Sequence, residues 1–248
     1  MGDTALQILV PLPDRDFDTT ECSVLWDAAI KAGHEVVFAT EHGSIASCDP
    51  HLLGPGWRNP MPAKPSVVKM YERMTADSNF RRPITYGQID PAIYDAVHLP
   101  GGHSRGMRQY LESKQLQRKI VEFHYAGKVI GAICHGTLVL ARARDQATGK
   151  SLLHGRTVTT LIKPIETFAF MRTFYRVGRR YRTYWKYTED EVREAVGSQG
   201  HVEHGDSWGK PLVVIDGLLV TARYPADVVR YSERFLQLAE VTWAKHGA

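Results

Sequence analysis

Short aliphatic runs alternate with amphipathic stretches along most of the chain. The run at residues 6–10 is closed by two prolines, which indicates a short buried strand. The next stretch carries apolar residues at helical spacing from Val24 to Ala32, and Gly33 ends it. Residues 34–40 then predict a second strand. A strand, a helix and a strand in this order are typical of a right-handed crossover in a parallel sheet.

The same alternation continues to the end of the chain. Further strands are predicted at residues 94–99, 128–133, 156–161, 211–215 and 218–222. The last two are joined by an Asp-Gly turn, which is typical of a hairpin. Helices are predicted over residues 67–80, 109–125, 137–144 and 226–243, and the prolines of residues 50–65 predict a loop. We therefore expect one α/β domain over residues 1–248, with a mainly parallel sheet sandwiched between helices.

One segment, residues 168–187, breaks this pattern with eight aromatic and six basic residues and no acidic residue. We expect it to belong to an insertion at about residues 168–195. Arginines and aromatic rings together could bind anions or nucleic acid, form a subunit interface or close over a site as a lid, and the segment could also be a partly buried surface excursion. Because the whole chain has a net charge of only +4, we expect a lid or a dimer contact rather than nucleic acid binding.

The composition is that of a globular protein, with 43% hydrophobic and 23% charged residues. No apolar run reaches the roughly 18 residues of a membrane span, so no membrane partner is expected. The start of the chain lacks the basic region of a signal peptide. Three cysteines are too few for a disulfide scaffold, so we expect a reducing, cytoplasmic location.

Cys134 is the first candidate for chemistry, because it stands between a predicted buried strand and a predicted helix. A sharp turn there lifts a side chain out of the sheet at the carboxyl ends of the strands, where α/β proteins bind ligands. The positive end of the helix dipole favours a thiolate over a thiol. Gly136 permits such a tight turn. The alternative is that Cys134 is a small buried hydrophobic residue, like most free cysteines.

Other polar residues are expected near the same edge of the sheet. Glu21 belongs to the first turn of the helix that follows the first strand, where it could either meet the sulfur or compensate the helix dipole. Gly102 closes a later strand, and its amide could contribute to an oxyanion hole. A polar loop holds four further residues that could bind a metal, but their spacing matches no known template: His201, Glu203, His204 and Asp206. We expect neither a metal nor a cofactor.

Two of these motifs together resemble the ThiJ/PfpI family. They are Leu-Pro-Gly-Gly at residues 99–102 and Ile-Gly-Ala-Ile-Cys-His-Gly at residues 130–136. The resemblance implies a flavodoxin-like, class I glutamine amidotransferase-like fold and a homodimer. It also implies that Cys134 is the reactive nucleophile and that Glu21 hydrogen-bonds to it. Gly102 and the amide of His135 would form the oxyanion pocket, and the His135 ring would act as a general base.

The chain departs from the family pattern at two places. Where one branch of the family carries an acid that orients the histidine, this sequence has Lys163, with Glu166 three residues later. A lysine cannot accept the imidazole N–H, so Glu166, a neighbouring subunit or no group at all supplies the acid. Arg223 begins the stretch where glutamine amidotransferases have His-x-Glu, which argues against glutaminase activity. His201 and Glu203 have the right spacing but precede the last strands.

The resemblance implies a cysteine-dependent lyase or hydrolase that acts on a small-molecule carbonyl or amide. The activity could be of the glyoxalase III, deglycase or amidase type. The alternative is a non-catalytic stress, redox-sensing or chaperone-like protein in which Cys134 is oxidised.

Overall fold

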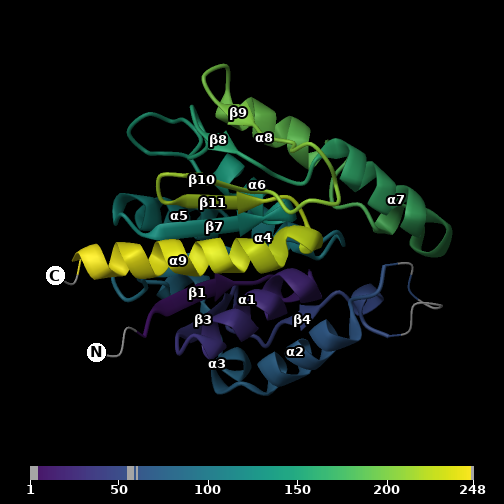
Figure 1. Ribbon diagram of the computed structural model, residues 1–248, viewed down its shortest axis with the longest axis horizontal. Helices are drawn as coiled ribbons and strands as arrows, with labels where there is room; N and C mark the ends of the chain where they lie inside the picture. The colour runs from purple at the N-terminus through teal and green to yellow at the C-terminus, as the bar shows by residue number, and fades with distance from the viewer. Residues whose placement is uncertain (1–4, 55–58, 60, 247–248) are drawn as a thin grey trace.

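The computed structural model describes residues 5–54, 59 and 61–246, and its centre is a seven-stranded sheet (Figure 1). In chain order the strands are β1 (Gln7–Pro11), β3 (Glu35–Thr40), β5 (Ile84–Thr85), β6 (Ala96–Leu99), β7 (Val129–Ile133), β10 (Val213–Asp216) and β11 (Leu219–Ala222). They lie side by side in the order β10-β11-β7-β6-β1-β3-β5. Every neighbouring pair is parallel except the β10–β11 hairpin, which confirms the predicted mainly parallel sheet.

Nine α-helices are found in the described part of the chain. They are α1 (Thr19–Lys31), α2 (Pro65–Ala76), α3 (Ser78–Arg81), α4 (Met107–Glu112), α5 (Lys114–Tyr125), α6 (Thr137–Arg142), α7 (Lys163–Val177), α8 (Thr188–Val196) and α9 (Val228–His246). Five short 3-10 turns complete the list: η1 (Pro50–Leu52), η2 (Tyr86–Gln88), η3 (Cys134–Gly136), η4 (Gly178–Arg180) and η5 (Pro225–Asp227).

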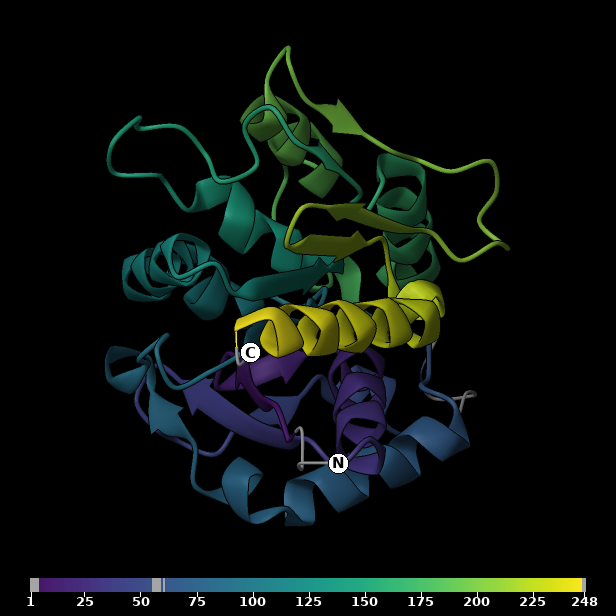
Figure 2. The ribbon, with the colours of Figure 1, turned by 60° about the vertical axis from the view of Figure 1, so that its left-hand side comes forward.

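The helices cover both faces of the sheet. The chain moves from β1 to β3 in one direction and from β6 to β7 in the other, so right-handed crossovers place α1 and α5 on opposite faces. Helix α9 lies beside α1 and over β7 and β11 (Figure 2). Helix α7 lies at the end of the molecule away from both chain termini (Figure 1).

Two predicted helices are each broken in two, which corrects the expected elements. Ser113 separates α4 from α5, and its hydroxyl accepts a hydrogen bond of 3.2 Å from the Leu116 amide. Asp77 separates α2 from α3 and accepts a hydrogen bond of 2.8 Å from the Asn79 amide. In both places a short polar side chain caps a new helix, which competes with continuation of the preceding one.

Another correction concerns the predicted strand at residues 156–161. Only β8 (Thr157–Val158) forms there, and it pairs with β9 (His201–Val202) in a separate two-stranded sheet. The next amide, of Thr159, donates to the side chain of Thr221 rather than to a strand backbone. A second small sheet pairs β2 (Arg15–Phe17) with β4 (Ser47–Cys48), and neither strand was expected.

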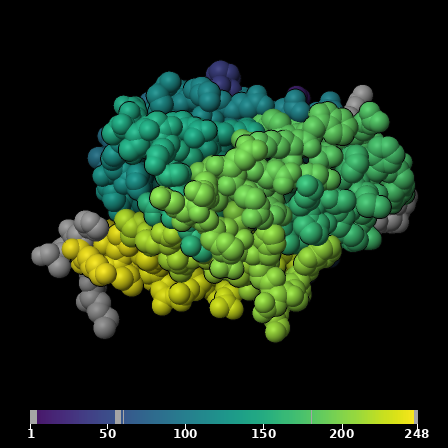
Figure 3. Space-filling model, turned by 90° about the horizontal axis from the view of Figure 1, so that it is seen from above, coloured from purple at the N-terminus to yellow at the C-terminus, as the bar shows by residue number. Residues whose placement is uncertain are grey.

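Some expectations fall on residues that the structure does not describe. The interpretation of the chain start concerns residues 1–4, and two prolines of the predicted loop are Pro55 and Pro60. Within the described ranges, no helix is both long enough and apolar enough to cross a membrane. The predicted insertion corresponds to α7, η4 and α8, although α7 already begins at Lys163. Figure 3 shows that α7 and α8 (green) form much of one face of the molecule.

A buried polar chain links three elements next to the carboxyl end of β6. The His98 ring lies 2.8 Å from the Tyr231 hydroxyl of α9 and 3.2 Å from the Glu21 backbone oxygen of α1. Tyr231 can approach this closely because Gly131 has no side chain: a Cβ there would lie 2.2 Å from the hydroxyl oxygen. This network fixes the first turn of α1 against the sheet.

A fully buried ion pair holds the segment before β10. Arg223 donates to both carboxylate oxygens of Asp227, at 2.8 and 2.9 Å. Its remaining N–H groups donate to the carbonyl oxygens of His204, Ser207 and Lys210. Arg223 therefore orders the loop that follows β9, which is a structural role.

We predict that Asp227→Asn lowers the free energy of unfolding by about 3–5 kcal/mol, because it leaves a buried guanidinium without its counter-charge. Glu194→Gln is the control, since the Lys186–Glu194 pair is exposed and is worth less than about 1 kcal/mol. Chemical denaturation of both variants measures the difference. Equal stabilities of the two variants would contradict the assigned role of the buried pair.

Candidate active site

Cys134 lies on a sharp turn directly after β7, as predicted. Its backbone has φ +57°, a left-handed conformation that non-glycine residues seldom adopt. The turn continues through η3 into α6, and the Thr137 hydroxyl donates to the Cys134 carbonyl oxygen at 2.8 Å. Gly136 is required for close packing, because a Cβ there would lie 2.1 Å from the Leu99 carbonyl oxygen at the end of β6. The two strand ends are therefore held together.

Glu21 faces this turn from the first turn of α1. Its side chain is completely buried, and Oε2 accepts a hydrogen bond of 2.7 Å from the Gly101 amide. The other oxygen, Oε1, is buried without a hydrogen-bond partner. The N-cap of α1 is instead Asp18, which accepts hydrogen bonds from the Thr20 and Glu21 amides. Glu21 is thus not a capping residue, and its carboxyl group is directed at the turn.

Of the double glycine after β6, Gly101 packs against the same turn, whereas Gly102 packs against the backbone of Asp16. A Cβ at Gly101 would lie 2.7 Å from the His135 nitrogen and 2.8 Å from Cys134 Cβ. A Cβ at Gly102 would lie 2.5 Å from the Asp16 carbonyl oxygen. Side chains are therefore excluded at both positions, and the backbone reaches the region of the sulfur. The His135 amide donates a hydrogen bond toward the Cys134 sulfur.

The imidazole of His135 lies between the sulfur and a carboxyl group. Its Nδ1 is 3.7 Å from Cys134 Sγ, and its Nε2 is 3.9 Å from Glu166 Oε1. Glu166 is buried in the first turn of α7, and its Oε2 accepts a hydrogen bond of 2.9 Å from the Thr188 amide. Lys163 points elsewhere, with Nζ 3.4 Å from Asp190 Oδ2. Among the described residues of this chain, Glu166 supplies the carboxyl group that faces His135.

Two aromatic side chains near the sulfur were not expected from the sequence. The His103 ring meets the His135 ring edge-on, with centroids 4.9 Å apart. Tyr181, from the aromatic-basic segment, stacks on His103 with centroids 5.8 Å apart. The position of His103 directly after Gly102 was a usable signal, because the glycine was already placed at the site. Nothing local marks Tyr181, which arrives from a distant part of the chain.

His103 and Tyr181 also line a cavity of about 390 Å³. Helix α7 forms one wall, and the apolar part of the lining includes Leu52, Ile165, Phe168, Trp208 and Pro225. Cys134 does not line this cavity and is only 1% exposed, but its sulfur lies within 4.8 Å of a ring nitrogen of His103. A ligand in the cavity therefore lies next to His103, which adjoins the sulfur.

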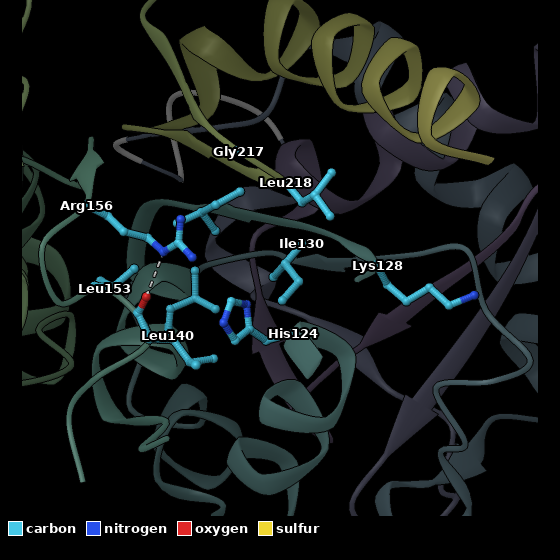
Figure 4. A pocket seen from close by; sticks show the side chains of 10 residues that line it. His124, Lys128, Ile130, Leu140, Leu153, Arg156, Gly217 and Leu218 are labelled. Atoms are coloured by element: carbon cyan, nitrogen blue, oxygen red, sulfur yellow. Dashed lines mark hydrogen bonds between the residues drawn. The ribbon is translucent and has the colours of Figure 1, made fainter. Parts of the chain in front are cut away.

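Figure 4 shows a second, smaller cavity of about 170 Å³ that is lined by His124, Lys128 and Arg156. It opens beside the beginning of β7, whereas Cys134 follows the end of that strand. The Arg156 guanidinium there is paired with Asp216 at 3.0 Å. No cysteine, serine, threonine or carboxyl side chain is among its lining residues, so we place the candidate chemistry at the larger cavity.

Burial controls the protonation of the acids around Cys134. It raises the pKa of Asp18 to about 6 and the pKa of Glu166 to about 7. It also raises the pKa of Glu21 well above its usual range, and the adjacent Asp18 carboxylate adds to this effect. In contrast, burial lowers the pKa of His135 well below its usual range. The imidazole is therefore neutral at rest.

The expected preference for a thiolate at Cys134 is wrong. Burial raises the pKa of this thiol well above its usual range, and the carboxylates of Glu21 and Asp18 raise it further. The His135 amide acts in the opposite direction, but its effect is smaller. Removal from water thus outweighs the favourable end of a short helix, and the sulfur carries its proton at rest.

The polar loop after β9 does not contribute to this site. His204 pairs with Glu189 at 2.9 Å, and His201 lies 3.7 Å from Glu203 with both side chains exposed. Together with Asp206 they form no compact set of metal ligands within the described residues. The interpretation of His201 and Glu203 as a misleading His-x-Glu pattern is consistent with this geometry.

Comparison with known proteins relates the whole arrangement to one family. The family model described as ThiJ/PfpI family-like matches residues 12–191. A glutathione-independent glyoxalase of Saccharomyces cerevisiae is 27% identical over 133 residues, which are 52% of this chain and 52% of that protein. A deglycase of Thermococcus kodakarensis is 24% identical over 156 residues, which are 62% of this chain and 68% of that protein.

The match covers only part of the first curated relatives, 58% of a Schizosaccharomyces pombe protein described as uncharacterized and 52% of the yeast glyoxalase. Among solved structures, glyoxalase III from Candida albicans superposes with a TM-score of 0.71 at 20% identity. That superposition covers 95% of this chain and 98% of the other. At such low identity it shows a shared fold.

We predict that Glu166→Gln removes part of the pH dependence of stability. Burial in the folded protein raises the pKa of Glu166 from 4.5 to about 7. Between these pH values the unfolded chain loses this proton more readily than the folded protein does, so wild type becomes less stable as the pH rises. Glutamine stays neutral and can still accept the Thr188 N–H. The variant should therefore gain up to roughly 3 kcal/mol over wild type between pH 4 and pH 8.

Denaturation curves at several pH values test this expectation. Glu203→Gln is the control, because Glu203 is exposed and lies away from the turn at Cys134. A Glu166→Gln variant with the same pH slope as wild type would show that Glu166 is not buried beside His135.

Proposed function

This chain belongs to the ThiJ/PfpI family, and we propose that it is a cysteine-dependent enzyme in which Cys134 attacks a reactive carbonyl or amide carbon. One observation carries the proposal: His135 stands between the Cys134 sulfur and the Glu166 carboxyl group, at 3.7 and 3.9 Å. A nucleophile, a base and a group that orients the base are the components of this kind of catalysis. The glyoxalase and deglycase names of distant relatives point to the same chemistry.

The first step follows from the protonation states. The thiol transfers its proton to His135 Nδ1 as the sulfur forms a bond to the substrate carbon. Glu166 stabilises the imidazolium that results, since its carboxyl group faces Nε2. The negative charge that develops on the substrate oxygen can be met by the amides of Gly102 and His135. With an aldehyde substrate, the imidazolium then returns this proton to the oxygen, and the product is a hemithioacetal.

With an α-oxoaldehyde, the reaction is completed without an external oxidant. A base removes the proton from the former aldehyde carbon, and the electron pair reduces the neighbouring keto carbon, which gains a proton. His135 or Glu21 could move these protons, because both side chains face the turn at Cys134. The resulting thioester is hydrolysed by water, which releases a 2-hydroxy acid and restores the thiol.

The cavity favours a substrate larger than a three-carbon dicarbonyl. Its volume of about 390 Å³ falls within the range of drug-sized ligand sites, roughly 300–1,000 Å³. The side chains of Phe168, Trp208 and Leu52 make most of its wall apolar. We therefore propose a carbonyl or amide substrate that carries an aliphatic or aromatic group. The aromatic-basic segment contributes to substrate enclosure through Phe168 and Tyr181.

The competing proposal is a redox or stress role without turnover. It is favoured by the unpartnered Glu21 Oε1 beside Cys134, which could accept a hydrogen bond from an oxidised sulfur. It is disfavoured by the placement of His135 between the sulfur and Glu166, because oxidation of a sulfur needs no such arrangement.

A homodimer is also a proposal, as the resemblance implies. The outer surface of α7 and the segment after it expose Met171, Tyr175 and Trp185, an apolar group typical of an interface. Light scattering of the purified protein would show whether two copies associate.

We predict that Cys134→Ser lowers kcat/KM by at least about 10³-fold on every substrate of the protein. His135→Ala should cost about 10²-fold or more, because the general base is lost. The assay compares methylglyoxal, phenylglyoxal and aryl amides, and phenylglyoxal should be preferred to methylglyoxal. Cys48→Ala is the control, since Cys48 lies in β4 and does not line the cavity.

Two results would overturn the proposal. One is unchanged turnover in Cys134→Ser, and the other is the absence of any carbonyl or amide turnover by wild type. If turnover is absent while peroxide oxidises Cys134 before Cys22 and Cys48, the redox role takes its place.

A further inference from the structure

We propose that His103, Cys134 and His135 form a binding site for a zinc ion. One ligand atom from each residue can be chosen so that all three atoms lie within 4.8 Å of one another. No other three histidine, cysteine or acidic side chains converge in this way in the described ranges. Neither the sequence patterns nor the proposed carbonyl chemistry requires a metal at this position.

The chemistry of the three side chains suits zinc. One thiolate and two imidazoles are a donor set that Zn²⁺ accepts, with the fourth tetrahedral position left for water. Bond lengths of about 2.3 Å to sulfur and 2.0 Å to nitrogen place tetrahedral ligand atoms roughly 3.3–3.6 Å apart. Cys134 Sγ and His135 Nδ1 are already 3.7 Å apart. The longest separation, at most 4.8 Å, needs to close by up to roughly 1.2–1.5 Å.

The surroundings of His135 match those of a metal-bound histidine. If Nδ1 binds the ion, Nε2 carries the hydrogen and faces Glu166 Oε1 at 3.9 Å. Metal-binding histidines usually direct their second N–H to a carboxylate, which fixes the ring and its tautomer. Glu166 is itself held by the Thr188 amide at 2.9 Å. This second layer exists before any ion is bound.

Access also favours a metal ion here. His103 lines the large cavity, so one of the three ligand side chains faces a space that a hydrated ion can enter. As the Zn–S bond forms, the thiol proton leaves to solvent, and no oxidant or reductant is needed.

Zinc binding has a consequence for catalysis that rests on the proposed function. The bound ion occupies the sulfur electron pair that would attack a carbonyl carbon, so zinc and substrate exclude one another. Zinc should therefore inhibit turnover, and a chelator should restore it. The binding experiment below does not depend on turnover, so either proposal can fail alone.

The test uses the full chain after treatment with a chelator. Zn²⁺ is titrated in competition with a chromophoric chelator, and Co²⁺ is used as a spectroscopic substitute. We expect one ion per chain, and a Co²⁺ spectrum with tetrahedral d–d bands and a thiolate charge-transfer band. Cys134→Ser should abolish the charge-transfer band, and His103→Gln should weaken Zn²⁺ binding at least about 10-fold. His201→Ala is the control, because its side chain is exposed in the β9 loop.

Three outcomes would overturn the proposal. They are the absence of stoichiometric zinc binding, equal affinity in wild type and His103→Gln, and a cobalt spectrum without a thiolate band. Circular dichroism verifies that each variant is folded. If Cys134→Ser does not fold, His103→Gln together with the wild-type cobalt spectrum still decides the question.

Discussion

The left-handed backbone at Cys134 is the constraint on which the site depends. Such a conformation costs about 1–3 kcal/mol and persists only where its surroundings enforce it. Here the enforcement comes from the close contact of Gly136 with the Leu99 carbonyl and from the packing of Gly101 against the turn. Glu21 completes the arrangement by binding the Gly101 amide. The ends of β6 and β7 and the start of α1 are thereby joined around one sulfur.

Burial then determines the chemistry at this sulfur. Removal from water raises the pKa values of the thiol and of the nearby carboxyl groups, which favours their protonated forms. It lowers the pKa of His135, which keeps this ring neutral. In this state Cys134 and His135 are both uncharged. A thiolate and an imidazolium form only when a substrate binds and the proton moves from Cys134 to His135. Glu166 is placed to stabilise the imidazolium at that moment. The same neutral imidazoles and exchangeable thiol proton are compatible with a metal ion.

Much of the architecture was predictable because it depends on local patterns. The buried strands and the turn at Cys134 follow from aliphatic runs that end in glycine-containing motifs. The broken helices were not predictable, because single caps at Ser113 and Asp77 overrode a continuous apolar pattern. The strand predicted at residues 156–161 was too long, because only the two residues of β8 form a strand and they pair outside the main sheet.

The candidate site was predictable only in part. Cys134, Glu21 and Gly102 follow from their places at the ends of parallel strands. The sequence alone could not show that Glu166 faces His135, because this depends on the position of α7 in the fold. The first turn of that helix lies next to His135. Tyr181 reaches the site only through the tertiary fold, which stacks it on His103. The raised pKa of Cys134 results from burial in the folded protein, which no sequence motif indicates.

The most direct measurement is an ultraviolet titration of the Cys134 thiolate, taken as the difference between wild type and Cys134→Ser. We expect Cys134 to keep its proton at neutral pH and to ionise only above the usual pKa range of a cysteine. A thiolate already present at or below neutral pH would contradict activation by proton transfer to His135.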